Sequence, residues 1–311
     1  MIPTLATVVE VLVRATPLAL TGLAVAIAFR GGVWNIGADG QFLVGAAGAA
    51  AVGVFATGVT GIASLPAALL AGAIAGSAWS GIAAILRTKA GALEVISTIM
   101  LNFVAAFGVS YLVRGPMQEP THVYPQTSDV TPAARLPIIL PGTRLHAGVL
   151  IAALLALALW WVLRATAFGF RVRAIGAGAE AARISGGVNT ERTAVAVFLL
   201  SGALAGLAGA VEVTGVTLAL YENISPGYGY TAIAVALLGA LDPIGVAIAA
   251  IGIASIETWS AALQRNSGIP STLAAVIEAC VVLGVIAAGR LRAGRTWWPA
   301  SARRRTYGID T

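Results

Sequence analysis

Charged residues are scarce in this sequence of 311 residues, of which only 10% are Asp, Glu, Lys or Arg. Soluble domains carry roughly 25% charged residues, because their whole surface faces water. A chain with 58% hydrophobic residues and so few charges cannot cover such a surface, whereas a lipid bilayer removes the requirement. The composition therefore excludes an ordinary soluble fold. It predicts an all-α polytopic membrane helix bundle that forms a single transmembrane domain over residues 1–311.

Cysteine and histidine are nearly absent. Cys280 is the single cysteine, so no intramolecular disulfide is possible, and the two histidines, His122 and His146, lie in or beside one polar loop. These residues make no recognisable metal site, and two exposed histidines offer little for acid–base catalysis. The phosphate-binding Gly-x-x-x-x-Gly-Lys-[Ser/Thr] motif is also missing. We therefore expect no enzyme and no cofactor, and any use of ATP must belong to another chain.

Long apolar runs dominate what is present. A spanning helix needs about 20 apolar residues, and nine segments qualify or nearly qualify. They are Val8–Phe29, Gln41–Val59, Leu65–Leu86, Val95–Val113, Ala147–Leu163, Ala194–Val216, Tyr230–Leu241, Ile244–Leu263 and Thr272–Ala288. The seventh is short, which is typical of a broken helix that lines a pathway. The patterns Gly72-x-x-x-Gly76 and Gly202-x-x-x-Gly206 predict close helix packing.

The basic residues predict the orientation, because cytoplasmic loops are enriched in Lys and Arg. Placing the loop 164–192 and the basic tail 290–311 inside puts 14 of the 19 Lys+Arg on the cytoplasmic side. This placement explains the formal net charge of +6 without nucleic acid. The C-terminus is then cytoplasmic, and the loop 114–146 with its six prolines is external. We expect two inverted halves, about 5–145 and 146–290.

Two polar, glycine-rich bends echo each other, one at residues 35–41 before the second span and one at residues 223–229 before the seventh. The alternation of spans places the first near the cytoplasmic side and the second near the outside, as an inverted repeat requires. The candidates to line a translocation pathway are Asn35, Asp39, Gln41, Asn223, Ser225 and Tyr228. Asp39 can cap the helix that follows it, and an ordinary capped turn explains the first bend equally well. Tyr228 suits a membrane interface or stacking on a planar solute.

Four more polar residues fall inside spans, where a central Asp, Lys or Arg costs about 2.5–3.5 kcal/mol on insertion scales. They are Asn102, Glu212, Glu257 and Glu278. Glu94, by contrast, lies near a helix start. Such side chains usually face protein or water, so a bond between helices and a contact with solute both remain open. We add Asn102 to the pathway candidates and expect at most one or two glutamates to touch substrate.

The loop 164–192 contains a short predicted helix. The run Glu180-Ala-Ala-Arg183 favours helix, and Gly186-Gly187 would end it. A helix outside the membrane between two spans is typical of a contact with a partner protein. A connecting loop that carries inside arginines is the alternative, and composition does not separate the two.

Four stretches resemble the ABC-transporter permeases of the branched-chain amino acid, ribose and nucleoside type, and most closely their nucleoside branch. They are residues 29–41, 94–102, 168–186 and 225–239. The run Asn35–Gln41 matches that branch's Asn-Ile-Gly-Ala-Glu/Asp-Gly-Gln motif, and the resemblance covers residues 5–290.

The resemblance implies a permease subunit of an ATP-driven importer that moves a small polar solute, a nucleoside or a simple sugar, by alternating access. Its partners would be an ABC ATPase, a second permease or a copy of itself, and an external solute-binding lipoprotein. The residues expected to lie in a groove on the ATPase are Ala179, Glu180, Arg183 and Gly186. The family usually has a tenth helix before the first span, so we expect that the start was placed too late. An ion-gradient-driven secondary transporter that works without an ATPase is the alternative function.

Overall fold

The computed structural model describes residues 4–55 and 61–267 and a few residues between 272 and 284. Every regular element within these residues is helical. They are α1 (Leu5–Arg30), α2 (Ala38–Phe55), η1 (Gly61–Ala63), α3 (Ser64–Ala90), α4 (Glu94–Arg114), η2 (Pro132–Ala134), α5 (Gly148–Ala165), α6 (Ala167–Gly186), α7 (Thr190–Glu212), the π-helical η3 (Val213–Thr217), α8 (Tyr228–Leu238) and α9 (Pro243–Ser267). More than half of the ninth predicted span falls outside the described residues, as do Glu278 and the tail 290–311.

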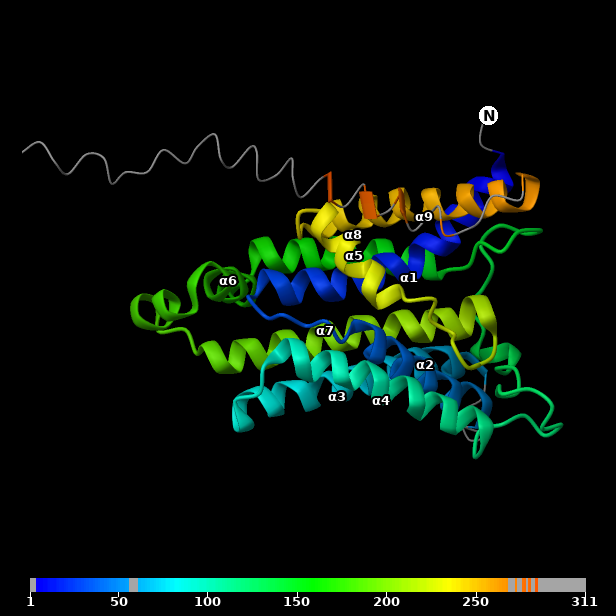
Figure 1. The fold of residues 1–311 in the computed structure, drawn as a ribbon, viewed down its shortest axis with the longest axis horizontal. Coiled ribbons are helices and arrows are strands. Elements are labelled where there is room, and N and C mark those ends of the chain that lie inside the picture. Colours follow the sequence, from blue (N-terminus) through cyan, green and yellow to red (C-terminus); the bar gives the residue numbers. More distant parts are fainter. Residues whose placement is uncertain are drawn as a thin grey trace, which may run out of the picture.

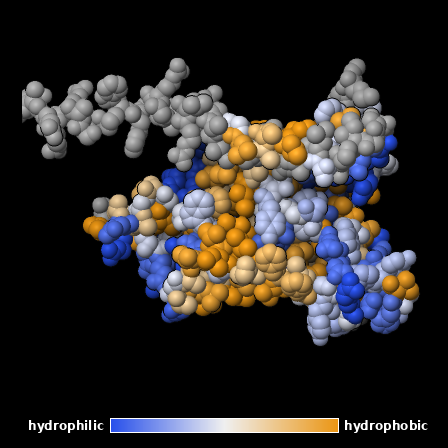
Figure 2. Space-filling model, viewed as in Figure 1, coloured by the Kyte–Doolittle hydropathy of each residue, from blue (hydrophilic) through white to orange (hydrophobic). Residues whose placement is uncertain are grey.

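Eight of the predicted spans coincide with these helices, and seven helices are long and apolar enough to cross a membrane. On the face shown in Figure 2, an apolar belt crosses the middle of the bundle, with hydrophilic surfaces at its two ends. Large apolar side chains such as Leu70, Phe107 and Leu154 are exposed on α3, α4 and α5, as expected of surfaces that face lipid. The prediction of an all-α polytopic membrane bundle is confirmed.

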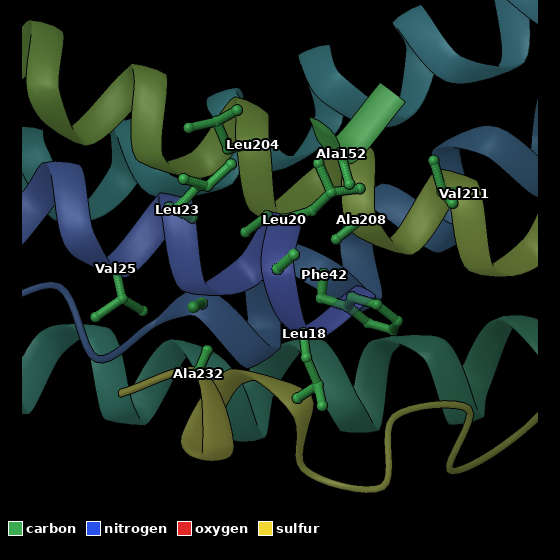
Figure 3. Close-up of a cluster of buried hydrophobic side chains, with 14 of the residues drawn as sticks. Leu18, Leu20, Leu23, Val25, Phe42, Ala152, Leu204, Ala208, Val211 and Ala232 are labelled. Atoms are coloured by element: carbon green, nitrogen blue, oxygen red, sulfur yellow. The ribbon is translucent and has the colours of Figure 1, made fainter. Parts of the chain in front are cut away.

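The helices α1 and α7 form the centre of the bundle (Figure 1). They are the most deeply buried spans: 83% and 67% of the residues in the apolar stretch of each helix are buried inside the protein. Leu20 and Leu23 of α1 lie among Leu204 and Ala208 of α7 and Phe42 of α2 (Figure 3). This apolar cluster fixes the two central helices, around which the interrupted segments described below are arranged.

The two small-residue patterns pack against each other, as predicted for close helix approach. A Cβ atom built at Gly76 of α3 would lie 2.6 Å from the Cα atom of Gly206 in α7, and one at Gly202 would overlap Ser80. A Cβ at Gly45 of α2 would also overlap the backbone of Gly206. Three helices therefore meet with their backbones nearly in contact, which only glycine permits at these positions.

The helix α6 stands at one end of the bundle, outside the apolar belt (Figure 1). It begins earlier than predicted, because the Thr166 hydroxyl accepts a hydrogen bond from the Gly169 N–H and caps its first turn. Gly178 interrupts it with extended backbone (φ 171°, ψ 99°). It ends at Gly186, as predicted, followed by the left-handed Gly187 (φ 58°).

The loop 115–147 lies at the opposite end and is bonded to the segment that follows α7. The Val130 N–H donates to the Leu218 carbonyl at 2.7 Å, and the Leu136 N–H donates to the Thr214 carbonyl at 2.8 Å. Val130 is fully buried. These bonds satisfy backbone groups of both segments, so the loop is a packed part of the bundle.

His146, at the end of this loop, is buried with 1% of its surface exposed. Its Nδ1 accepts a hydrogen bond from the Gly148 N–H, and its Nε2 has no partner within the described residues. Burial, with a smaller effect of Arg144, lowers the pKa of His146 to about 4. The expectation of two exposed histidines is therefore wrong for His146, which is a neutral interior residue at physiological pH.

Candidate functional site

The first bend begins where α1 ends, at the α6 end of the bundle. Gly32 adopts a left-handed conformation (φ 68°) that turns the chain back. Residues 31–37 contain no helix and can span at most roughly 25 Å. They lead the chain into the interior of the bundle, where α2 begins at Ala38.

One face of α4 satisfies the backbone of this irregular segment. Three polar residues one helical turn apart line that face: Glu94, Thr98 and Asn102. The Glu94 carboxylate accepts from the Trp34 N–H at 2.9 Å, and the Thr98 hydroxyl accepts from the Ile36 N–H at 3.2 Å. The Asn102 amide donates to the Ile36 carbonyl and accepts from the Gly40 N–H. Asn102 therefore lies beside the first bend and binds its backbone. The polar face formed by Glu94, Thr98 and Asn102, which we call the ladder on α4, was not recognised from the sequence.

Asn35 and Gln41 form a closed polar network inside the bundle. Both are buried, at 0% and 1% exposure. The Asn35 amide nitrogen donates to Gln41 Oε1 and to the Ser201 hydroxyl of α7, and Gln41 Nε2 donates back to Asn35 Oδ1. The Ser201 hydroxyl in turn donates to the Ala24 carbonyl of α1 at 2.7 Å. These two pathway candidates therefore bind protein groups, and they fix the bend between α1 and α7.

The second bend begins at the other end of the bundle, after the π-helical turn η3. Leu218 and Asn223 adopt left-handed conformations (φ 59° and 61°), and Gly227 does so at the start of α8 (φ 97°). Asn223 is exposed to solvent and serves the turn. The helix α8 has 11 residues, about 16 Å, and is too short to cross an apolar core of roughly 30 Å.

The two bends meet inside the bundle at Asp39. Its Oδ1 accepts a hydrogen bond from the Ser225 hydroxyl at 2.7 Å and another from the Gly229 N–H at 3.0 Å. Ser225 Oγ also accepts from the N–H groups of Gly227 and Tyr228, at 3.1 Å each. A Cβ at Gly229 would overlap the Asp39 backbone. The carboxylate of one interrupted helix thus sits on the positive end of another, where an anion is stabilised.

This contact corrects two expectations. The bends begin at opposite ends of the bundle, but the helix starts that follow them meet, so their predicted separation on opposite membrane sides is wrong. The sequence allowed Asp39 to cap its own helix, whereas its carboxylate accepts a hydrogen bond from Gly229 in the first turn of α8. The alternation of spans treats each bend as a surface loop, and a chain that re-enters the membrane does not obey that assumption.

Two aromatic rings flank the contact. The Tyr228 ring packs against Phe42 of α2, with ring centroids 5.5 Å apart. The Tyr230 hydroxyl accepts a hydrogen bond from the Asn102 amide at 3.3 Å. The region where the bends meet is therefore a carboxylate, a hydroxyl and aromatic faces held between α2, α4 and α8. Within the described residues no group of three or more His, Cys, Asp or Glu is arranged to hold a metal ion.

Glu212, at the last position of α7, is the most buried of the glutamates within the described spans. It is 4% exposed, and its Oε2 has no hydrogen-bond partner among the described residues. Glu94 differs, because it pairs with Arg87 at 3.2 Å and accepts from the backbone. Sequence composition singled out both residues and did not distinguish the satisfied carboxylate from the unsatisfied one.

The chain matches, over residues 7–286, the family described as the permease component of branched-chain amino acid transport systems. The chain belongs to this permease family. It is 39% identical over 287 residues to a glucose ABC transporter permease protein of Haloferax volcanii, covering 89% of this chain and 75% of that protein. It is 35% identical over 287 residues to a guanosine ABC transporter permease protein of Bacillus subtilis, covering 91% and 82%. A nucleoside ABC transporter permease protein of Lactococcus lactis subsp. cremoris is 28% identical over 283 residues, covering 88% and 77%.

Membership of this family makes the chain a transport subunit of an ABC importer and not an enzyme. ATP is hydrolysed on a separate chain in such systems, and a substrate-binding protein accompanies them. The recognition of the nucleoside and simple-sugar branch from four sequence motifs is confirmed. The multi-pass membrane location is confirmed by the family and by the apolar helices.

In this permease, α6 contacts the start of the first bend directly. A Cβ at Gly176 would overlap the main-chain carbonyl oxygen of Arg30, and Gly32 lies beside the same glycine. The Arg30 side chain donates to the Leu241 carbonyl, just beyond the C-terminal end of α8, at 3.0 Å. Arg164 also reaches this turn and forms an ion pair with Asp242 at 3.5 Å. One residue, Arg30, therefore touches α6 with its backbone and the end of α8 with its side chain.

The four residues predicted to contact the ATPase lie on the part of α6 beyond its interruption. Glu180 and Arg183 are highly exposed and form a loose ion pair at 3.9 Å, and Gly186 is exposed at the helix end. Ala179 borders a cavity of about 270 Å³ between α6, the first bend and the start of α7. Arg87 lines the same cavity, and its Nη1 has no partner within the described residues. This end of the bundle therefore offers an exposed short helix next to a hollow that is lined by both polar and apolar residues.

Proposed function

We propose that the chain is the membrane subunit of an ATP-driven importer for a nucleoside or a simple sugar. The observation that carries the proposal is the contact of Asp39 with Ser225 and Gly229, where two interrupted helices meet in the interior. Helices broken at the middle of the membrane are the usual place where transporters hold a solute. The solute would pass when this contact opens first to one side and then to the other.

The substrate class follows from the relatives, whose names specify glucose, guanosine and nucleosides. These solutes share a small ring that carries several hydroxyl groups. Asp39, Ser225 and Tyr228 supply acceptor, donor and aromatic groups at the contact between the bends. A few such groups in an otherwise apolar surrounding suit a polar ring.

The assembly we propose contains an ABC ATPase against α6, a second permease or a copy of this chain, and a solute-binding lipoprotein on the side of the loop 115–147. The C-terminus lies in the cytoplasm, because that orientation gives the excess of inside arginines. The two halves are inverted copies, each with a long helix, a bend and a helix that starts in the interior. The interruption at Gly178 supports a separate docking role for residues 179–186.

The route from the ATPase to the solute runs through Arg30. Movement of α6 presses on the Arg30 backbone through Gly176, and the Arg30 side chain holds the Leu241 end of α8. The other end of α8 carries Gly229, which donates to Asp39. A helix of 11 residues moves as a rigid rod, so a shift at Leu241 reaches Asp39 without bending of the bundle.

Transport into vesicles that contain the assembled importer tests the function. Wild-type complex is expected to accumulate radiolabelled guanosine or glucose only with ATP and the solute-binding protein present. Asp39→Asn, which removes the charge and keeps the shape, should reduce uptake at least ten-fold, as expected for loss of a charge-assisted hydrogen bond. Asp129→Asn is the matched control, because Asp129 is exposed and pairs only with Arg135 among the interactions described here. Full uptake with Asp39→Asn would remove the helix contact from the mechanism.

A charge-reversed double variant, Glu180→Arg with Arg183→Glu, tests the ATPase contact. It should weaken assembly with the ATPase and abolish uptake, while the protein still inserts into the membrane. Reversal of the pair formed by the exposed Asp129 and the half-buried Arg135 provides a control with equal charge change on the opposite end of the bundle. Normal uptake by the α6 variant would contradict the proposed docking surface.

A further inference from the structure

Glu212 has an unusual position for a carboxylate. It is 4% exposed, no ion pair within 4 Å is recorded for it among the described residues, and its Oε2 accepts no hydrogen bond. The other buried polar side chains near the bends, such as Asn35 and Asn102, are bonded to protein groups. Burial of an unsatisfied carboxylate is costly, so a group that arrives only during the working cycle is the natural partner.

Both central helices are irregular at the depth of Glu212. The Ser201 hydroxyl of α7 donates to the Ala24 carbonyl of α1, and the two helices run antiparallel. Glu212 lies as many residues beyond Ser201 as Val13 lies before Ala24, so Glu212 and Val13 lie at the same level of the bundle. The π-helical turn η3 starts directly after Glu212, and such turns are frequent at functional sites. Pro17 lies inside α1 and has no N–H, so the Val13 carbonyl lacks its usual helical donor. An unsatisfied carboxylate oxygen and a main-chain carbonyl that lacks its helical donor therefore lie at a similar depth.

The surrounding charges favour a neutral ligand over a cation. Arg14 and Arg144 act on Glu212 through space, but both pair with Glu10, at 2.9 Å and 3.9 Å. Together with Glu10 and Glu212 these groups carry charges that sum to zero, so no net charge draws a metal ion or an ammonium group to this region. Hydroxyl groups remain as donors that bring no positive charge.

Aromatic side chains complete the site. Burial, followed by the negative charge of Glu212, raises the pKa of Tyr221, which lies in the turn between η3 and α8. Tyr228 follows the Ser225–Gly227 turn and packs on Phe42. A Cβ at Gly209, three residues before Glu212 in α7, would overlap the Phe42 carbonyl oxygen. Glu212 therefore lies close to the Phe42–Tyr228 contact, on the side of the loop 115–147.

We propose that Glu212 is a solute-binding residue, and that its carboxylate accepts hydrogen bonds from adjacent hydroxyl groups of a sugar ring. A nucleoside's ribose and a free hexose both fit this description, because the hydroxyl chemistry is shared. This inference rests on the proposed function and extends its site from Asp39 toward the end of α7. The bound ring supplies the donors that Glu212 and the Val13 carbonyl lack.

The test compares solutes with and without the hydroxyl groups in the assembled importer. Uptake of guanosine and of 2′,3′-dideoxyguanosine is measured for wild type, Glu212→Gln and the control Glu222→Gln, whose carboxylate pairs with Arg114. Glucose and 1,5-anhydro-2-deoxyglucose form the second arm. The same binding protein serves every variant, so its own selectivity cancels when the ratios of uptake are compared. Glu212→Gln should lower uptake of the hydroxylated solute about ten- to hundred-fold and change that of the deoxy analogue less than two-fold.

Each result decides the question. An equal loss for both solutes, or no loss for either, overturns the inference, and so does wild-type uptake that depends on Na⁺. If Glu212→Gln does not assemble, Glu212→Asp decides, because it keeps the charge and withdraws the carboxylate by one methylene. The glucose and guanosine arms identify which ring is bound. Absence of any ATP-dependent uptake by wild type would instead refute the proposed function, and the two failures are therefore distinguishable.

Discussion

The backbone of Gly176 in α6 lies directly against the main-chain carbonyl of Arg30 at the end of α1, with no room between them for a methyl group. Gly176→Ala should therefore displace α6 from the first bend. We expect uptake to fall at least ten-fold while the complex still hydrolyses ATP, because residues 179–186, which we propose to dock on the ATPase, are untouched. ATP hydrolysis and uptake are measured on the same vesicles.

The matched control for that variant is Gly178→Ala. Gly178 has extended backbone that any residue adopts, and a Cβ there would meet only the Ala181 methyl at 3.7 Å. Uptake should be unchanged. Equal behaviour of the two variants would contradict a specific role of the contact between α6 and Arg30.

The meeting point of α2, α3 and α7 predicts a strong stability effect. Gly206→Ala introduces a methyl group between backbones that are already in contact, and such overpacking costs about 1–3 kcal/mol. The midpoint of thermal unfolding in detergent should fall. Gly108→Ala in α4 is the control, because a Cβ there meets nothing within 4 Å, and removal of a helix glycine should stabilise by about 0.5–1 kcal/mol.

The ladder on α4 predicts a cost for removing a single oxygen atom. Thr98→Val keeps the shape of the side chain but leaves the Ile36 N–H without its acceptor, which costs about 1–3 kcal/mol. Thr88→Val removes a hydroxyl that bonds only within its own helix and should change little. Thermal unfolding of the two purified variants measures the difference, and similar midpoints would refute the role of Thr98.

His146 predicts a dependence of stability on pH. Its folded pKa is lowered from 6.5 to about 4, so the unfolded chain takes up a proton first as the pH falls. The stability contribution is complete above pH 6.5 and is lost between pH 6.5 and 4, by up to about 3 kcal/mol. His146→Gln should flatten this part of the unfolding curve. His122→Gln, at an exposed position, should leave the slope as it is in wild type.

The spans were predictable because hydropathy and length report directly on contact with lipid. The short α8 was also visible as an apolar run too brief to cross. The meeting of Asp39 with Ser225 was not predictable, because counting spans says nothing about how deep a polar bend re-enters. The sequence placed both residues among the candidates, but it could not show that one binds the other.

The spacing of Glu94, Thr98 and Asn102 by four residues was a readable signal for one polar helix face. The groups that this face binds could not be predicted, because the backbone N–H and carbonyl groups of an irregular segment do not affect the amino-acid composition. For Glu212, the sequence could not show that hydrogen-bond partners are missing. Its sequence context resembles that of any glutamate at a helix end, and only packing reveals that its carboxylate is unsatisfied.

The hydrogen bonds of Val130 and Leu136 with Leu218 and Thr214 join the proline-rich loop to the irregular end of α7 as one cap. In the assembly we propose, a solute-binding protein that docks on this cap would also displace the neighbours of Glu212, without inserting anything into the bilayer. Docking of the solute-loaded binding protein would then also expose the Glu212 carboxylate. The permease would become able to accept the solute in the same step in which the solute is delivered.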